Sequence, residues 1–253
     1  MNTDAEYYKR FDHLIKMNES HKNYHNWIVN IFKPYLGDPI LEIGSGSGNI
    51  TEILLNYGYK VIATDIEKGN IKYINKQFTN VNNNNLLTLT IDIENFNTKE
   101  SNAILSEVDT ILCINVLEHI QNDSKAINNM YRILLNSKAV TPKRLLLLVP
   151  AFNFIYGTLD VHAGHYRRYR KKHVKDLLEK SGFKMVQLFY MNLIGFLGWF
   201  VSGRIQKNKE DSPINSQVRL FDKLVPFLEK VENIITPPFG VSIIAIGEIQ
   251  KQL

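Results

Sequence analysis

Short apolar runs alternate with amphipathic segments through most of the chain. Five runs in the first 150 residues have the length and composition of buried strands: 39–43, 60–66, 87–93, 108–114 and 144–149. Between them, apolar residues recur at helical spacing, as at Ile71, Ile74 and Phe78. This alternation predicts βαβ units and therefore a parallel sheet with helices on both faces.

The pattern changes in the last third of the chain. A helix is predicted over 171–181 and strands over 183–190 and 241–249. Between these strands lies a long insertion, with a helix predicted over 193–201 and apolar residues at helical spacing from Val218 to Ile235. Pro237 and Pro238 then end that helix. Upstream of the first strand, residues 24–35 also read as a helix.

Length and composition favour a single α/β domain. The chain has 253 residues, 44% of them hydrophobic, which is enough for a substantial core. Its only cysteine, Cys113, falls in an apolar run, so neither a disulfide framework nor a cysteine metal site is expected. The first 16 residues are charged and contain no apolar stretch, so we expect no secretory signal and a cytoplasmic protein.

Charge is unevenly distributed between the two halves. Residues 1–126 carry 11 Lys and Arg against 16 Asp and Glu, whereas residues 127–253 carry 19 against 9. A basic half of this kind suits an anionic partner. No interleaved stacking platform accompanies the basic residues, so nucleic acid is not expected to be that partner.

A glycine-rich turn follows the first predicted strand. It reads Glu42-Ile-Gly44-Ser45-Gly46-Ser-Gly48, and a turn of this kind lets backbone amides approach a ligand closely. A P-loop would end in Gly-Lys-Ser/Thr, but Asn49 follows Gly48. A dinucleotide fold would place its third glycine where Asn49 stands. The spacing instead resembles motif I of the class I S-adenosylmethionine-dependent methyltransferases.

Later strands carry further residues of that resemblance. Asp65 ends the second strand, where the family's carboxylate binds both ribose hydroxyls, and Ile66 follows it. Asp92 and Ile93 stand where the family contacts adenine. Asn115 stands where the family holds the methionine end of the cofactor. The resemblance implies a Rossmann-like, seven-stranded, mostly parallel sheet with helices on both faces and the last strand antiparallel.

The resemblance also implies an activity and a domain plan. We expect one methyltransferase domain over 1–253, with a helical extension at 1–37 and a helical insertion at 193–238 that covers the acceptor site. The cofactor is expected to be S-adenosylmethionine and the acceptor a small molecule, a sugar or a lipid-linked compound. Two alternatives stay open: a cofactor-binding protein without turnover, and an enzyme that transfers aminopropyl groups.

The acceptor is expected to lie against two segments: Glu118-His119, which follows the fourth strand, and the segment from Pro150 onward, which follows the fifth. The second segment is unusually rich in polar and aromatic groups, and its candidate acceptor-binding residues are Tyr156, Asp160, Arg167, Arg168 and Tyr169. It resembles the corresponding segment of a bacterial subgroup of small-molecule methyltransferases. Its cations favour an acceptor that carries a phosphate or carboxylate.

A base is required only if the acceptor is a hydroxyl or a protonated amine. His165 is the first candidate, because the pKa of histidine suits proton transfer near neutrality. His162, His119 and Tyr166 are the other candidates. Asp160, His162 and His165 do not follow a dependable metal-ligand spacing, so no metal ion is expected.

A stretch without charged residues overlaps the start of the insertion. It runs from Met185 to Gly203, near the length of a membrane span, although the polar residues Gln187 and Asn192 interrupt it. We expect a sheet strand followed by a helix. Peripheral contact with an anionic bilayer is the less favoured interpretation. The sequence leaves the oligomeric state open.

Overall fold

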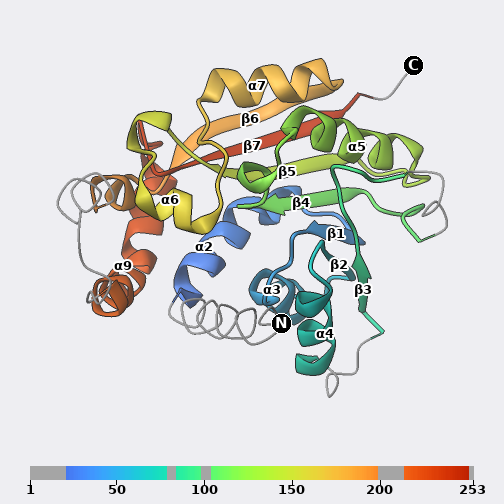
Figure 1. Ribbon diagram of the computed structural model, residues 1–253, viewed down its shortest axis with the longest axis horizontal. Coiled ribbons are helices and arrows are strands. Elements are labelled where there is room, and N and C mark those ends of the chain that lie inside the picture. The colour runs from blue at the N-terminus through green and yellow to red at the C-terminus, as the bar shows by residue number, and fades with distance from the viewer. Residues whose placement is uncertain (1–20, 79–83, 98–103, 199–213, 251–253) are drawn as a thin grey trace, which may run out of the picture.

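The computed structural model describes residues 21–78, 84–97, 104–198 and 214–250. Most of the predicted N-terminal extension and the middle of the predicted insertion lie outside these ranges. Among the described residues, a seven-stranded sheet has the order β3-β2-β1-β4-β5-β7-β6 (Figure 1). Its strands are β1 (Ile40–Ile43), β2 (Val61–Asp65), β3 (Leu86–Thr90), β4 (Thr110–Ile114), β5 (Arg144–Pro150), β6 (Phe183–Met191) and β7 (Ser242–Ile249).

The strand directions confirm the predicted fold class. β1 pairs in parallel with both β2 and β4, and Ile40 lies opposite Val61 on one side and Thr110 on the other. β7 is antiparallel to both of its neighbours, β5 and β6. The sheet is therefore mixed, with the last strand reversed, as predicted.

Alternating residues of each central strand face two separate cores. In β5, Leu145 and Leu147 belong to one apolar cluster, and Leu146 and Leu148 belong to the other. Successive side chains of a strand point to opposite faces, so a strand covered on both sides must be apolar throughout. This explains the run of leucines in the sequence.

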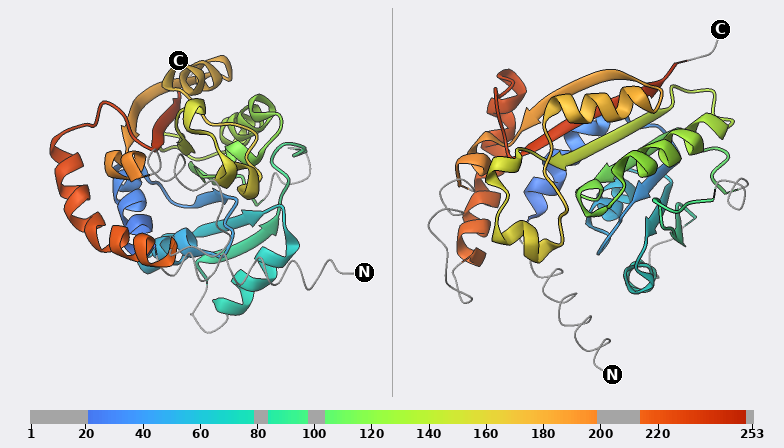
Figure 2. Two further views of the ribbon diagram at one scale, coloured as in Figure 1. Left: turned by 60° about the vertical axis from the view of Figure 1, so that its left-hand side comes forward. Right: turned by 45° about the horizontal axis from the view of Figure 1, so that its top comes forward.

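Helices cover the two faces. On one side lie α5 (Asp123–Asn136) and α7 (Lys171–Lys180), and on the other lie α2 (Lys22–Phe32), α3 (Asn49–Asn56) and α4 (Lys68–Gln77) (Figures 1 and 2). Three short helices, η1 (Lys33–Tyr35), η2 (Leu117–His119) and η3 (Asn153–Ile155), and the six-residue α6 (Thr158–Ala163) lie in the connections. The layers are those of a doubly wound α/β fold.

The predicted insertion forms a long helix that packs against α2. This helix, α9 (Ile214–Ile234), begins before the predicted Val218, and residues 193–198 form a turn of helix after β6. The carboxylate of Asp222 accepts hydrogen bonds from the amides of Asn23 and Tyr24 at 3.2 and 3.0 Å. Because the first amides of a helix lack partners within it, Asp222 does for α2 what a capping residue would do.

The carboxyl ends of the parallel strands share one edge of the sheet. In an open α/β sheet, ligands bind at this edge, where the strand order reverses. Here the reversal falls between β1 and β4. Helices α6 and α9 both lie beyond this edge (Figure 1).

Candidate active site

The glycine turn joins β1 to α3 in a conformation that needs glycine. Gly44, Gly46 and Gly48 have φ angles of +71°, +54° and +84°, a region that L side chains rarely adopt. A Cβ atom on Gly44 would lie 2.3 Å from Cγ2 of Val116, so this position also needs a small residue. The amide of Ser45 donates to the carbonyl of Thr64 at 2.8 Å and fastens the turn to β2.

Glu42 lies beneath the turn and is 4% exposed. Its Oε2 atom accepts a hydrogen bond of 2.6 Å from the hydroxyl of Thr51, in the first turn of α3. Burial raises the pKa of Glu42 to about 7, while the Thr51 bond acts in the opposite direction. The acid therefore supports the turn from below.

Asp65 connects the end of β2 to the glycine turn. Its Oδ2 accepts from the amide of Gly46 at 2.9 Å, and its Oδ1 accepts from the amide of Glu67 at 2.8 Å. A carboxylate has about four acceptor positions, so two amides leave capacity for further donors. Ile66 follows it with an apolar side chain that is 61% exposed.

The predicted adenine-contact residues follow β3. Oδ1 of Asp92 accepts from the amides of Glu94 and Asn95 at 3.0 and 3.1 Å, and so shapes its own turn. The side chain of Ile93 is 5% exposed, and its carbonyl accepts from Nδ2 of Asn129 at 2.9 Å. The turn after β3 is thus held by the Asp92 carboxylate and by the side chain of Asn129.

Asn115 follows β4 and is exposed, with a φ angle of +52°. Its amide donates to the carbonyl of Leu148 at 2.9 Å, which fixes its backbone against β5. Asn115, Asp65 and Gly46 therefore lie at one edge of the sheet, as predicted from parallel strands.

These groups fit an adenosyl cofactor. At Gly46 the position of a Cβ atom meets no atom within 4 Å among the described residues, so open space lies above the backbone there. Next to it stand a carboxylate with free acceptor positions and the exposed apolar side chain of Ile66. The carboxylate of Asp65 can accept hydrogen bonds from ribose hydroxyls, and the side chain of Ile66 can pack against an adenine ring.

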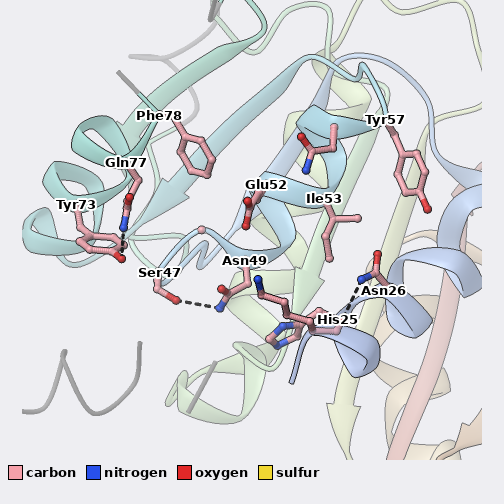
Figure 3. Close-up of a pocket in the computed structure, with 13 residues that line it drawn as sticks. His25, Asn26, Ser47, Asn49, Glu52, Ile53, Tyr57, Tyr73, Gln77 and Phe78 are labelled. Atoms are coloured by element: carbon pink, nitrogen blue, oxygen red, sulfur yellow. Dashed lines mark hydrogen bonds between the residues drawn. The ribbon is translucent and has the colours of Figure 1, made fainter. Parts of the chain in front are cut away.

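A separate pocket of about 670 Å³ lies on the other side of the turn. Residues of α2, the turn, α3 and α4 line it, including His25, Glu52, Tyr57 and Phe78 (Figure 3). Gly48 is the one predicted cofactor residue among its lining residues. The pocket therefore borders the predicted cofactor edge without coinciding with it.

Asp160, in α6, organises the segment that follows β5. This fully buried carboxylate accepts hydrogen bonds from Nδ1 of His165 at 2.8 Å, Nε of Arg168 at 2.7 Å and the amide of Gly157 at 2.9 Å. Burial alone would raise the pKa of Asp160, but these donors outweigh it and lower the pKa. Asp160 is thus an ionised centre around which the segment folds.

Three predicted acceptor-binding residues form contacts within the protein itself. Arg168 is 3% exposed and paired with Asp160. Arg167 pairs with Asp123 at 2.7 Å. The hydroxyl of the buried Tyr169 lies 3.1 Å from Oδ2 of Asp123, and burial followed by Asp123 raises its pKa. These side chains hold the segment against the start of α5.

The remaining candidates in the segment are more accessible. The hydroxyl of Tyr156 donates to the carbonyl of His165 at 2.6 Å, and the side chain of Tyr166 is 56% exposed. Nδ1 of the exposed His162 lies 2.7 Å from the carbonyl of Thr158, within α6. His162 does not join the cluster formed by the other two predicted histidines.

His119 and His165 come together although 46 positions separate them. Their rings meet edge to face with centroids 4.7 Å apart. Glu118, which was not a predicted site residue, completes the group: its Oε1 atom lies 4.0 Å from Nε2 of His165. Burial raises the pKa of Glu118 to about 8. Its place directly before His119, after a buried strand, was the signal available in the sequence.

A group of aromatic residues from the connections around β5, β6 and β7 was also missed. Phe152, after β5, stacks on Tyr190 at 4.9 Å, and Phe196 meets Phe152 at 5.6 Å. Phe239 meets Phe196 at 5.1 Å, and Phe154 is 62% exposed. These five rings come from four separate stretches of the chain, so local spacing in the sequence could not predict that they would lie together. We call them the aromatic wall.

The stretch considered for membrane contact divides as the sequence suggested. Residues up to Met191 belong to β6, residues 193–198 are helical, and the rest of the stretch lies outside the described residues. In the described parts of the chain, no helix has both the length and the apolar character that crossing a bilayer would demand.

The fold and this edge resemble those of the class I S-adenosylmethionine-dependent methyltransferases. Residues 41–137 match the sequence model of a family described as Methyltransferase domain. That range covers the glycine turn, Asp65, Asp92 and Asn115. This part of the chain is therefore similar to a methyltransferase domain.

Solved structures share the whole fold. In a complex between the Haloferax volcanii Trm112 methyltransferase activator and a putative methyltransferase, the similar chain has a TM-score of 0.62 and 12% identity, over 96% of this chain and 97% of that one. Magnesium protoporphyrin IX methyltransferase from Synechocystis, with bound S-adenosylhomocysteine, has a TM-score of 0.57 and 13% identity, over 93% and 86%.

A third solved structure carries the same demethylated cofactor. The N-methyltransferase NodS from Bradyrhizobium japonicum, with S-adenosylhomocysteine, has a TM-score of 0.54 and 14% identity, over 90% of this chain and 86% of that one. No curated protein matches the sequence. The named neighbours act on chemically different acceptors, so the likeness concerns the fold and not the acceptor.

Proposed function

We propose that the chain binds S-adenosylmethionine along the edge formed by the glycine turn, Asp65, Asp92 and Asn115, and transfers its methyl group to a small molecule. The observation that supports this proposal most directly is the hydrogen bond that the Gly46 amide donates to the carboxylate of Asp65. It joins a glycine turn with open space above it to a carboxylate that keeps free acceptor positions. The arrangement suits a ribose beside a closely approached backbone.

The acceptor belongs between this edge and the Glu118–His119–His165 cluster. When bound, S-adenosylmethionine supplies a methyl group on a positively charged sulfur. The chain's own task is then to hold the acceptor in line with that group and to exclude water, since orientation alone contributes much of the catalysis in such a displacement. Asn115 lies just before η2, which carries Glu118 and His119, so the cofactor edge and the cluster are neighbours in the chain.

For a hydroxyl or ammonium acceptor, His165 is the proposed base. Its Nδ1 atom is engaged by Asp160, which leaves Nε2 to accept a proton on the side of Glu118. Asp160 is in turn held by Arg168 and the Gly157 amide. Asp160 and Arg168 are therefore positioning residues, since neither has an exposed side chain.

The aromatic wall favours an acceptor with an apolar or aromatic body. Phe154 and Phe239 are 62% and 37% exposed at the same edge as the cluster. Ligand sites are mostly apolar with a few polar groups that set orientation. Arg167 and Arg168 are already paired within the protein. That pairing weakens the case for an anionic acceptor, which would have to use other cations such as Arg170.

Calorimetry with S-adenosylmethionine and S-adenosylhomocysteine tests the cofactor site. We expect one-to-one binding of both, and failure of both to bind would overturn the proposal. Transfer of a labelled methyl group in a cell extract, followed by identification of the product, would then reveal the acceptor. Cofactor binding without transfer to any component would favour the non-catalytic alternative.

His165→Ala tests the proposed base once an acceptor is known. We expect kcat to fall by about 100-fold or more, in line with the usual contribution of acid–base catalysis. The matched control is Lys175→Ala, because Lys175 lies on the exposed face of α7 in a surface pair with Glu179. Equal kcat values for the two variants would remove His165 from the reaction.

A further inference from the structure

Glu118, His119 and His165 have the composition of a metal site. One carboxylate oxygen and two ring nitrogens lie within 4.8 Å of one another. Two of the residues come from η2, and the third comes from the loop after α6. Two histidines and one glutamate make up a ligand set of catalytic zinc sites, in which a further position stays open.

The distances suit a shared ion. Zinc bonds to nitrogen and oxygen are about 2.0–2.2 Å long, so two ligand atoms of a tetrahedral ion lie about 3.4 Å apart, and an arriving ion would draw the side chains of this cluster closer together. Oε1 of Glu118 and Nε2 of His165 are 4.0 Å apart. His119 is exposed, and one of its ring nitrogens lies within 4.8 Å of the ligand atoms of Glu118 and His165.

His165 is already oriented as a ligand. Metal-bound histidines almost always donate their other ring N–H to a carboxylate or carbonyl, which fixes the tautomer and turns the free nitrogen towards the ion. Nδ1 of His165 has this bond, at 2.8 Å to Asp160. Arg168 and the Gly157 amide hold Asp160 in place, so this support is rigid before any ion arrives.

Glu118 provides an independent sign of a missing ligand. Its side chain is 1% exposed, and in the described part of the chain its Oε2 atom has no hydrogen-bond partner. A buried polar atom without a partner is costly, and an ion bound at such a position is one recognised explanation. The orphaned atom belongs to the same carboxylate whose other oxygen faces His165.

We propose that Glu118, His119 and His165 bind a divalent transition ion of the zinc type, with open positions on the exposed side of His119. Its chemical role rests on the proposed function. A hydroxyl acceptor bound to the ion would give up its proton to water more easily, and its oxygen would then form the bond to the methyl carbon as the bond from that carbon to sulfur breaks. Nε2 of His165 cannot be both a metal ligand and the base. Metal binding at this site would therefore exclude His165 as the base.

Metal titration tests the site without any acceptor. The protein is stripped with a chelator and titrated with Zn²⁺ by calorimetry, and Co²⁺ is added separately to record its visible absorption. We expect one ion per chain and cobalt bands typical of four or five ligands. Absence of one-to-one binding, or binding of Mg²⁺ in preference to Zn²⁺, would overturn the proposal. The proposed function fails separately, if the same protein does not bind S-adenosylmethionine.

Two ligand variants and one control assign the residues. His119→Ala and Glu118→Gln should each weaken Zn²⁺ binding by about 100-fold or more, since changes even beyond the direct ligands cost about 10–100-fold. His162→Ala is the matched control, because it removes a neighbouring exposed histidine that lies outside the cluster. Wild-type affinity in His119→Ala, or lost affinity in His162→Ala, would contradict the ligand set.

Because His119 is exposed, His119→Ala keeps the test valid if Glu118→Gln does not fold, and a third variant tests the support of His165. Asp160→Asn leaves all three ligands in place but weakens the orientation of His165, and it should bind Zn²⁺ about 10–100-fold more weakly. Thermal unfolding in the absence of metal shows which variants are folded. A folded Asp160→Asn protein with wild-type affinity would show that Asp160 does not support the site.

Discussion

Oδ1 of Asp160 lies 2.8 Å from Nδ1 of His165, and the same oxygen lies 2.7 Å from Nε of Arg168. One buried carboxylate therefore connects His165 of the proposed site to a buried cation. Removal of one partner from such a group leaves the other charged and unpaired, which costs more than the pair itself contributes.

Asp160→Ala should destabilise the protein strongly. It leaves the Arg168 guanidinium buried without its counter-charge, and we expect a loss of about 3–5 kcal/mol in the free energy of unfolding. Urea denaturation measures this. Asp176→Ala, which removes an aspartate from an exposed pair with Lys172, should cause no measurable change. Similar losses in both variants would show that Asp160 is not the centre of the segment.

Gly46→Ala should abolish cofactor binding at moderate cost in stability. Its φ angle of +54° makes the substitution cost about 1–2 kcal/mol, and the new methyl group would enter the space into which the cofactor is proposed to fit. Gly58→Ala is a close control, because Gly58 has a φ angle of +86° and equally open surroundings but lies at the end of α3.

Calorimetry with S-adenosylhomocysteine and urea denaturation separate the two effects. We expect similar losses of stability in the two glycine variants but lost binding only in Gly46→Ala. Retained binding in Gly46→Ala would place the cofactor elsewhere.

Asp65→Ala should weaken cofactor binding by about 10-fold or more. A hydrogen bond to a charged group contributes about 1.5–3 kcal/mol, and a ribose offers two hydroxyl donors. Asp38→Ala is the control: Asp38 also accepts a backbone amide beside β2, that of Lys60, but at the opposite edge of the sheet. Calorimetry with S-adenosylhomocysteine compares the two, and equal affinities would contradict a ribose contact at Asp65.

The stability of the cofactor-free protein should depend on pH through Glu42. Burial raises its pKa from 4.5 to about 7 in the folded state, so its protonated form is the one that folding favours. The resulting stability is fully present below pH 4.5 and is lost as the pH rises through 7. A shift of this size corresponds to about 3 kcal/mol.

Glu42→Gln isolates that contribution. The amide keeps the shape of the protonated acid but does not titrate, so the difference in unfolding free energy between wild type and variant should change with pH between 4.5 and 7. The unfolding free energy of the variant minus that of wild type should therefore be larger above pH 7 than at pH 4. A difference that does not depend on pH would show that Glu42 does not titrate in this range.

Phe154→Ala tests the aromatic wall. Its ring is 62% exposed, so its removal should hardly change stability, whereas KM for an acceptor with an apolar body should rise several-fold. Steady-state kinetics with the identified acceptor measure this. Ile234→Ala, an exposed apolar residue at the end of α9, is the control. An unchanged KM would place the acceptor away from Phe154.

Local spacing was sufficient for the parallel strands and for the residues that meet at their carboxyl ends. The alternation of apolar runs predicts the strands because a buried strand must be apolar on both faces, as Leu145–Leu148 show. The glycines at 44, 46 and 48 were recognisable because each needs a conformation that other residues avoid. Asp65 and Asn115 could be expected near the glycine turn, since the carboxyl ends of parallel strands lie at one edge of the sheet.

The acceptor side was decided by tertiary structure. Arg168 and His165 stand three positions apart in one basic stretch and both contact Asp160, yet Arg168 is buried whereas His165 turns its second ring nitrogen towards Glu118. That difference arises because the segment after β5 folds back onto the start of η2, where the amide of Tyr166 donates to the carbonyl of Glu118 at 2.8 Å. Contacts between residues more than 40 positions apart leave no periodicity in a sequence, and so the grouping of Glu118 with His165 and the aromatic wall became visible only in the folded chain.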